Sequence, residues 1–302
     1  MFVAPPVLKA EVFATLPDPY RKRGQTAPWL QVQRRGLQTH SFIEGPVLDA
    51  DGNLYFTDIP FGRIFRASPE GGIELVHEYD GEPNGLKLLG AGRLLIADHK
   101  HGIVLLDLAS GTMSPYCDRP LLERFKGVND LFLTAAGDLY FTDQGQSGLQ
   151  DPTGRVYHRQ ADGTLRCLMD NIPSPNGIVL DASGESLLVA VTRANQVWRL
   201  PLLRDGSVSK VGALINLSGG VGPDGLALGV DGNLAVCHPG LATVWMFDPY
   251  GEPLLRIVSP VGRMTTNCVF GGPDGRTLFI TESDTGTILR ADLPALGNRQ
   301  AA

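Results

Sequence analysis

Six times along the chain, a polar residue opens a short apolar run that leads through a Gly-containing turn into a second apolar run. These six opening residues are Glu44, Asn84, Asn129, Asn176, Asp224 and Asn267. The intervals between them are 40, 45, 47, 48 and 43 residues, which is typical of repeats that each form one four-stranded propeller blade. The pattern therefore predicts an all-β fold, a six-bladed β-propeller of four-stranded antiparallel blades.

The second apolar runs of the six units resemble one another in sequence and in position. They read NLYFTD at 53–58, RLLIAD at 93–98, DLYFTD at 138–143, SLLVAVT at 186–192, NLAVCH at 233–238 and TLFITE at 277–282. Each run ends 14 to 16 residues after its opening residue. Turn pairs such as Asp51–Gly52 separate the first run from the second, and a third run follows, as at 62–67. Short strands joined by tight turns predict an antiparallel meander in each unit.

Six such units account for most of the 302 residues, so we expect residues 1–302 to form one propeller domain. Residues 1–40 precede the first unit, and we expect them to close the ring and cover one face. In particular, Val12–Leu16 is expected to supply the outer strand of the last blade. A ring sealed by both ends of the chain leaves no open sheet edge.

The charge pattern predicts no nucleic-acid partner. The formal net charge is −6, and the basic clusters are the short segments Arg21–Arg23 and Arg34–Arg35. Nucleic-acid-binding domains typically carry a larger basic face, so we interpret these clusters as solvated surface. The sequence also has no apolar run of membrane-spanning length, which predicts no membrane partner.

The cysteines and the first residues favour a cytoplasmic protein. The four cysteines have no CxxC spacing and lie within or beside apolar runs, at Cys117, Cys167, Cys237 and Cys268. We expect buried free thiols, as in a reducing compartment, rather than disulfides or a zinc site. Residues 1–13 lack the basic and apolar segments of a signal peptide, so export is not predicted.

The opening residues have the chemistry of a metal site. If each begins the innermost strand of its blade, all six side chains meet at one end of the central channel, two as carboxylates and four as amides. Such hard oxygen ligands suit Ca²⁺, Mg²⁺ or Mn²⁺, while Zn²⁺ or Fe²⁺ stays possible because carboxylates also bind these ions. Glu44 and Asp224 would together offset the charge of one divalent ion.

A structural alternative exists for some of these residues. Asn-Gly and Asp-Gly pairs, present at 84–85, 176–177 and 224–225, are also the commonest hairpin-turn pairs. That explanation does not fit Glu44 or Asn129, which are followed by other sequences. Because all six residues start an apolar run instead of separating two strands, we favour the metal site for the set.

Several segments resemble a known family. They are FIEGP at 42–46, GVNDL at 127–131 with YFTD at 140–143, SPNGI at 174–178 and GPDGL at 222–226. In order and spacing they are similar to the senescence-marker-protein/gluconolactonase/regucalcin family of six-bladed propellers, and more distantly to the diisopropylfluorophosphatases. The resemblance runs from about Phe42 to Leu293.

The resemblance implies a metal-binding set. Position by position, it implies that Glu44, Asn176 and Asp224 bind one divalent metal ion, for which Ca²⁺ is the expected species. Asn129 looks like an Asn that is a fourth ligand in some members of the family and a substrate contact in others.

The resemblance also implies the reaction. Members typically hydrolyse a sugar or other aldonic lactone, so we expect a gluconolactonase-like hydrolase whose partner is a small-molecule lactone. The metal would act as a Lewis acid on the lactone carbonyl, and a carboxylate would activate water. Asp224 is the candidate catalytic base.

Further residues are candidates for substrate binding. Asp130 follows Asn129 in the family's Asn-Asp pair, with a hydrogen bond at the strand start as its alternative role. Asn84 and Asn267 occupy the remaining two blades and are expected to line or support the pocket. His238 ends a second run and could approach the channel as a hydrogen-bond donor; a structural role is its alternative. His99 has a similar position and weaker support.

Substrate choice is expected to depend on loops at the channel mouth. The segment 144–155 is longer than the matching link in the first unit and could form a pocket wall, or a solvated connector. Vertebrate members of the family carry an Arg at the position of Gly127. Its absence favours a less polar lactone.

Two other functions fit the same residues. One is a phosphotriesterase or fluorophosphatase, because the same metal can polarise a phosphoryl oxygen and Asp224 could act as a nucleophile. The other is a non-catalytic metal-binding propeller. Burial of two carboxylates without a cation would be costly, which argues against a purely structural ring. The lactone, the native metal and the oligomeric state stay open.

Overall fold

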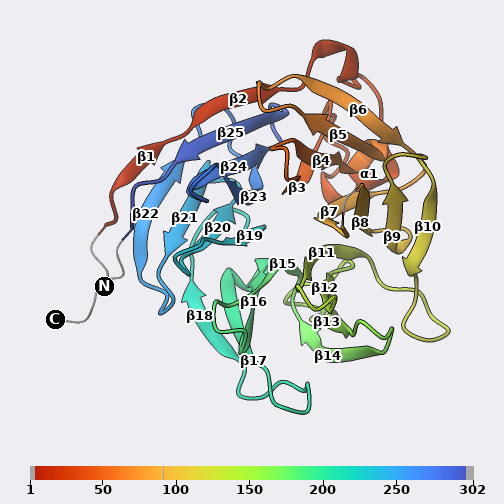
Figure 1. Cartoon of the computed structure of the whole chain (residues 1–302), viewed down its shortest axis with the longest axis vertical. Coiled ribbons are helices and arrows are strands. Elements are labelled where there is room, and N and C mark those ends of the chain that lie inside the picture. Colours follow the sequence, from red (N-terminus) through yellow and green to blue (C-terminus); the bar gives the residue numbers. More distant parts are fainter. Residues whose placement is uncertain (1–3, 91, 297–302) are drawn as a thin grey trace.

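The computed structural model describes residues 4–90 and 92–296, which form six β-sheets arranged in a ring (Figure 1). Each sheet contains four antiparallel strands in chain order, the fourth strand of the last sheet coming from the N-terminal part of the chain. The first strand of each sheet contacts the first strands of its two neighbours, so these six strands surround the central channel. The predicted six-bladed β-propeller is confirmed.

The first three blades follow one another along the chain. Their strands are β3 (Ile43–Leu48), β4 (Leu54–Asp58), β5 (Arg63–Ala67), β6 (Ile73–Glu78), β7 (Pro83–Leu88), β8 (Arg93–Asp98), β9 (Gly102–Asp107), β10 (Met113–Cys117), β11 (Val128–Leu133), β12 (Leu139–Asp143), β13 (Gly154–Arg159) and β14 (Leu165–Ile172). The last three blades contain β15 (Pro175–Leu180), β16 (Ser186–Val191), β17 (Gln196–Pro201), β18 (Gly212–Asn216), β19 (Leu226–Leu228), β20 (Leu234–His238), β21 (Thr243–Phe247), β22 (Pro253–Val258), β23 (Thr265–Gly271), β24 (Thr277–Glu282) and β25 (Thr287–Asp292).

The N-terminal part of the chain closes the ring. Strand β2 (Glu11–Thr15) pairs antiparallel with β25 and completes the sixth blade. It overlaps the segment Val12–Leu16 expected for this outer strand and begins one residue earlier. Strand β1 (Val7–Lys9) pairs parallel with β22 and adds a fifth strand to the fifth blade (Figure 1). The two strands together link the fifth and sixth blades and cover both outer edges.

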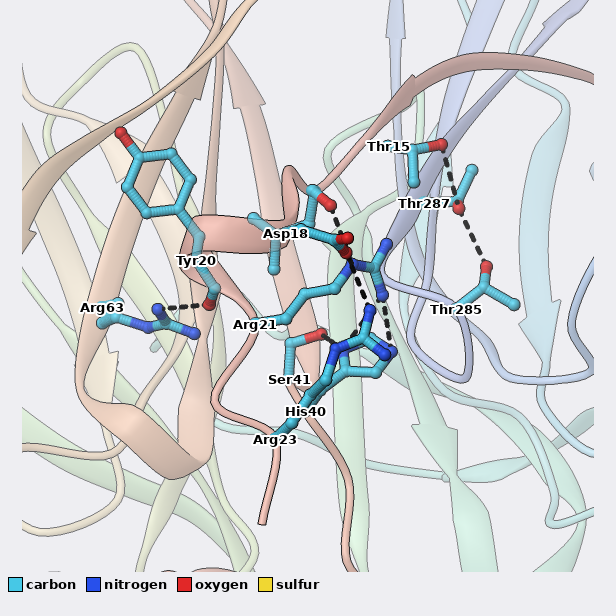
Figure 2. Close-up of polar contacts among 11 residues, drawn as sticks. Thr15, Asp18, Tyr20, Arg21, Arg23, His40, Ser41, Arg63, Thr285 and Thr287 are labelled. Carbon is cyan, nitrogen blue, oxygen red and sulfur yellow. Dashed lines mark hydrogen bonds and ion pairs between the residues drawn. The ribbon is translucent and has the colours of Figure 1, made fainter. Parts of the chain in front are cut away.

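The chain between β2 and β3 crosses to the end of the channel at which β3 begins. It contains a short 3₁₀ turn, η1 (Asp18–Tyr20), and the helix α1 (Pro28–Gln33). Figure 2 shows how its start is fixed: Arg63 Nη1 donates to the Tyr20 carbonyl at 2.7 Å, and an Arg21 side-chain nitrogen lies 2.7 Å from His40 Nε2. Helix α1 contacts η2 (Ile59–Phe61), the 3₁₀ turn after β4. No helix of the described part is long and apolar enough to cross a bilayer.

The core lies between neighbouring blades. Strand β4 is buried at every position, and so is the equivalent strand β12. Both faces of each such strand pack against an adjacent sheet, which explains why the second apolar runs are so alike. Among the cysteines, Cys237 and Cys268 are buried, Cys117 is half-buried, and Cys167 on the outer strand β14 is exposed. All four are free, but the expectation of burial was wrong for Cys167 because outer strands face solvent.

Candidate functional site

The six opening residues lie at the start of the innermost strands. In five blades, pairing between the first and second strands shifts register at or beside the opening residue, as between Glu44 and Val47 and between Pro175 and Ile178. Asp224 lies two residues before β19. A β-bulge interrupts the regular alternation of side chains and re-aims one of them. The bulges thus free these side chains from the packing between blades.

The glycines after the opening residues permit close packing of the innermost strands. Both Asn-Gly pairs lie inside such strands, at the start of β7 and β15, so the hairpin-turn alternative is wrong for them. A Cβ added to Gly85 would lie 2.3 Å from Asp130 Oδ1, and one added to Gly177 would lie 2.5 Å from the Asp224 carbonyl oxygen. Glycine is required because the next blade occupies the space of a side chain.

The acidic ends of the second strands hold the innermost strands in place. Asp58 Oδ1 accepts a hydrogen bond from Phe42 N at 2.6 Å, and Asp143 Oδ1 accepts one from Gly127 N at 2.8 Å. Each donor lies two residues before an opening residue. Asp58 also pairs with the buried Arg63. The final Asp of the FTD segments is therefore a structural anchor for the site.

A cavity of about 280 Å³ lies above the starts of the innermost strands. This volume is close to the lower end for small-ligand sites. Its lining contains five of the six opening residues: Glu44, Asn84, Asn129, Asn176 and Asp224. The remaining lining comes from α1, the turn after it and the loops between blades, and includes Trp29, Gln33, Arg34, Arg35, His99, Gln144 and Arg193.

Two carboxylates share the cavity floor. Glu44 is buried, whereas Asp224 keeps partial contact with the cavity. Burial and then the charge of Asp224 raise the pKa of Glu44 well above its ordinary value, although a hydrogen bond from Gly45 N opposes this. Burial and then the charge of Asp130 raise the pKa of Asp224 to about 7. A bound cation would relieve this cost of ionisation.

Amide groups surround the two carboxylates. Asn129 Nδ2 donates to Gln144 Oε1 at 3.1 Å, while Asn129 Oδ1 is buried and has no hydrogen-bond partner in the described part of the chain. Asn84 Oδ1 is buried and unpartnered in the same way. The Asn176 side chain hydrogen-bonds to the Asp224 carboxylate. Buried oxygens without a donor are suited to act as cation ligands.

The donor set mixes carboxylate and amide oxygens. Within residues 4–90 and 92–296, no group of three or more His, Cys, Asp or Glu side chains is placed to hold a metal ion. A cation at this floor would therefore need amide oxygens in addition to Glu44 and Asp224. Oxygen-only sets of this kind favour hard divalent ions.

Asp130 and Asn267 lie beneath the cavity and do not belong to its lining. Asn267 Nδ2 donates to Glu44 Oε2 at 2.8 Å. Asp130 Oδ1 accepts a hydrogen bond from Leu131 N at 2.8 Å, which is the strand-start role that the sequence left open. Burial raises the pKa of Asp130, while the charge of Lys87 opposes the rise. Both residues therefore support the cavity floor from beneath.

Residues 42–284 match the family described as SMP-30/Gluconolactonase/LRE-like region. The chain belongs to this family. Lactonase drp35 of Staphylococcus aureus strain USA300 is 30% identical over 254 residues, which cover 77% of this chain and 73% of that relative. Lactonase drp35 of Staphylococcus saprophyticus is 29% identical over 253 residues, with the same coverage of both chains.

Solved structures share the propeller fold of the SMP-30 family. A regucalcin of Agrobacterium tumefaciens, described as a calcium-binding protein, has a TM-score of 0.75 and 22% identity and covers 98% of this chain and 98% of its own. A gluconolactonase of Xanthomonas campestris has a TM-score of 0.75 and 21% identity, covering 94% of this chain and 97% of its own. At these identities the structures show the fold alone.

A histidine fills the space beside Gly127. A Cβ added to Gly127 would lie 2.1 Å from His99 Cε1. His99 lines the cavity, and burial lowers the pKa of its imidazole. From the sequence, His99 has weak support and Gly127 is related only to the polarity of the lactone; the missing side chain at 127 could have indicated that a residue of another blade fills the space.

His238 has a different environment. Its Nε2 lies 3.0 Å from the Gly219 carbonyl oxygen, and Trp245 Nε1 donates to its Nδ1 at 3.2 Å. Among the described residues, the cavity lining includes Pro239 but not His238. One ring nitrogen contacts the connection between β18 and β19 and the other contacts β21, so we do not carry His238 into the functional proposal.

Proposed function

We propose that this member of the SMP-30 family is a divalent-metal-dependent lactonase that acts on a small lactone. The observation that carries the proposal is the pair Glu44 and Asp224, two carboxylates on one cavity floor whose pKa values are both raised. Within the described residues, neither forms an ion pair with Lys, Arg or His. Such a pair is costly to keep in a folded protein unless a cation binds there.

Glu44, Asn129, Asn176 and Asp224 would hold the ion. The two carboxylates would offset its charge, and the buried Oδ1 of Asn129 has no hydrogen-bond partner among the described residues. Ca²⁺ is the first candidate because the ligand set is hard and because the regucalcin that shares the fold is described as calcium-binding. Mg²⁺, Mn²⁺, Zn²⁺ and Fe²⁺ are alternatives for the same test.

When bound, the ion would supply Lewis acidity toward the lactone carbonyl. The Asp224 carboxylate, partly open to the cavity, would take a proton from the water whose oxygen adds to the carbonyl carbon. The ring C–O bond then breaks, and Asp224 returns the proton to the leaving alkoxide. One lactone and one water thus yield one hydroxy acid. Asn84 and His99 line the cavity and would orient the ring substituents.

The test is proton release from gluconolactone and from a panel of aldonic and aliphatic lactones. Each substrate is measured with each divalent ion and with a chelator. Metal-dependent hydrolysis of one panel member, abolished by the chelator and restored by the ion, is the expected result. It agrees with the names of the curated relatives, which are lactonases.

Calorimetric titration of each ion distinguishes a protein that does not bind the ion from one that binds it but does not hydrolyse lactones. An ion that binds while no lactone reacts would overturn the proposal and favour organophosphate hydrolysis or a non-catalytic metal-binding propeller. Hydrolysis that survives complete removal of the metal would overturn the proposed role of the ion but not the lactonase activity.

A further inference from the structure

A second hollow adjoins the cavity and is not used by the chemistry described above. It has a volume of about 310 Å³ and is lined mainly by the loop 144–150. It shares four residues with the cavity: Gln33, Gln144, Ser174 and Arg193. A ligand bound at the floor could therefore extend past these residues into the second hollow.

The wall between the two hollows is polar and connected to the floor. Gln144 Oε1 accepts a hydrogen bond from Asn129 Nδ2, and Gln144 Nε2 donates to Ser174 Oγ at 3.0 Å. Asn129 belongs to the proposed metal-binding set, so this chain of bonds links the floor to the junction. Among the described residues that line the second hollow, none is an Asp or a Glu.

The lining of the cavity also contains three positively charged side chains. Arg34, Arg35 and Arg193 all line the cavity, and Arg193 also lines the second hollow. Arg34 lies 3.7 Å from Asp284, whereas Arg193 forms no ion pair within the described residues. An unpaired guanidinium beside neutral amides and hydroxyls is a typical site for a carboxylate or a phosphate.

We infer that the substrate is an anionic lactone, whose carboxylate or phosphate substituent lies between Arg193 and the loop 144–150 while its carbonyl lies at the floor. This inference rests on the proposed lactonase function and names its substrate class. From the sequence we expected a less polar lactone, because Gly127 offers no polar side chain. We infer an anionic lactone instead, because Arg193 would bind the polar substituent.

Two matched pairs of lactones test the inference. One pair is D-glucono-1,5-lactone and its 6-phosphate; the other is D-glucono-1,4-lactone and D-glucaro-1,4-lactone, which differ by one carboxylate. Each pair keeps the ring constant, so the ratio of kcat/KM within a pair measures recognition of the anion. A charge-assisted hydrogen bond corresponds to roughly tenfold or more in that ratio. The pair with the higher ratio identifies the anion as phosphate or carboxylate.

The variant Arg193→Gln should lower the anionic-to-neutral ratio about tenfold. The ratio is the proper readout because the charge of Arg193 also acts on Asp224, an effect common to both members of a pair. The control is Arg204→Gln, an exposed Arg of the same blade that lines neither hollow; it should leave the ratio unchanged. Added salt should lower the wild-type ratio.

Equal kcat/KM values within both pairs, or a ratio that Arg193→Gln does not change, would overturn the inference and leave the lactonase proposal standing. If other lactones of the panel react and none of these four does, the inference fails and the lactonase proposal stands. If no lactone of the whole panel reacts in the presence of bound metal, the lactonase proposal fails. Calorimetry with glucarate and gluconate then decides whether Arg193 still forms an anion site. Tighter binding of glucarate that is lost in Arg193→Gln supports an anion site, whereas equal binding of the two acids rejects it.

Discussion

Asn267 Nδ2 donates a hydrogen bond of 2.8 Å to Glu44 Oε2, and this bond joins the sixth blade to the first beneath the cavity. Asn267 is itself fixed, because its Oδ1 accepts a hydrogen bond from Cys268 N at 2.8 Å. The amide therefore cannot rotate freely, and it holds one oxygen of Glu44. The other oxygen of Glu44 remains for a ligand.

The first prediction concerns this bond. Asn267→Ala should lower the affinity for the divalent ion by about tenfold to a hundredfold, since Glu44 loses its side-chain partner and keeps only the hydrogen bond from Gly45 N. Calorimetric titration of Ca²⁺ measures the change. The control Asn216→Ala removes an exposed Asn on β18 and should not alter the affinity. Unchanged affinity in Asn267→Ala would show that Glu44 is held by other contacts or does not bind the ion.

The second prediction concerns pH and the metal-free protein. The pKa of Asp224 is raised from the ordinary 3.8 to about 7 in the folded chain, so its contribution to stability is complete below about pH 4 and is lost as pH rises through 7. The Tm of the metal-free protein should therefore fall over this range. Saturating divalent ion should reduce the fall, because the ion stabilises the charged carboxylate. Calorimetric scans with chelator and with metal give both curves.

The variant Asp224→Asn shows how much of the fall in Tm with pH comes from Asp224 and how much comes from other groups. The amide cannot ionise, so the fall in Tm with pH should become shallower without metal, and lactone turnover should be abolished. Asp51→Asn, which changes an exposed turn residue, should leave both the pH curve and turnover as in the wild type. Retained turnover in Asp224→Asn would reject Asp224 as the base, and an unchanged pH curve would show that the loss of stability comes from other groups.

A third prediction concerns the threonines of the FTD segments. Thr142 Oγ1 donates to the Asn176 carbonyl at 2.8 Å, and Thr57 Oγ1 donates to the Asn84 carbonyl at 3.0 Å. Each bond crosses to the next blade. Thr→Val at either position keeps the shape and leaves a carbonyl without its donor, at a cost of about 1–3 kcal/mol in the free energy of unfolding.

The two variants should differ in metal binding. Thr142→Val loosens Asn176, a member of the proposed metal-binding set, and should weaken Ca²⁺ binding severalfold. Thr57→Val loosens Asn84, which lies outside that set, and should leave Ca²⁺ binding nearly unchanged. Denaturant unfolding measures the stability of both variants, and calorimetry measures their Ca²⁺ affinity. Equal losses of Ca²⁺ affinity would contradict the assignment of Asn176, and not Asn84, as a metal ligand.

The ring could be predicted from the sequence because every blade repeats the same pattern of buried and polar positions. A second strand buried on both faces, a turn and a bulged inner strand recur at a period of about 45 residues, so six copies reinforce one interpretation. The same repetition located Glu44 and Asp224 on one floor. The repeat could not predict the segments that lie outside the repeated units.

Strand β1 and helix α1 belong to that part. β1 has three residues and pairs parallel to β22, and no alternation of three residues can specify a partner. Helix α1 has six residues, too few for a helical period, yet Trp29 and Arg34 of this region line the cavity. His99 was underrated for a similar reason: its position depends on the space left by Gly127 in the next blade.

The last prediction tests whether the glycines of the inner strands are fixed by their neighbours. A Cβ at Gly177 would lie 2.5 Å from the Asp224 carbonyl oxygen and 2.6 Å from Leu226 N. Since these are backbone atoms, Gly177→Ala must push the fifth blade away, which should destabilise the protein by about 2 kcal/mol or more, toward the upper end of the usual range for a substitution. It should also weaken Ca²⁺ binding through Asp224. Gly212→Ala, where nothing lies within 4 Å, should change stability by about 0.5 kcal/mol or less. Denaturant unfolding of the two variants makes the comparison, and similar stabilities would mean that the blades can separate at the floor without cost.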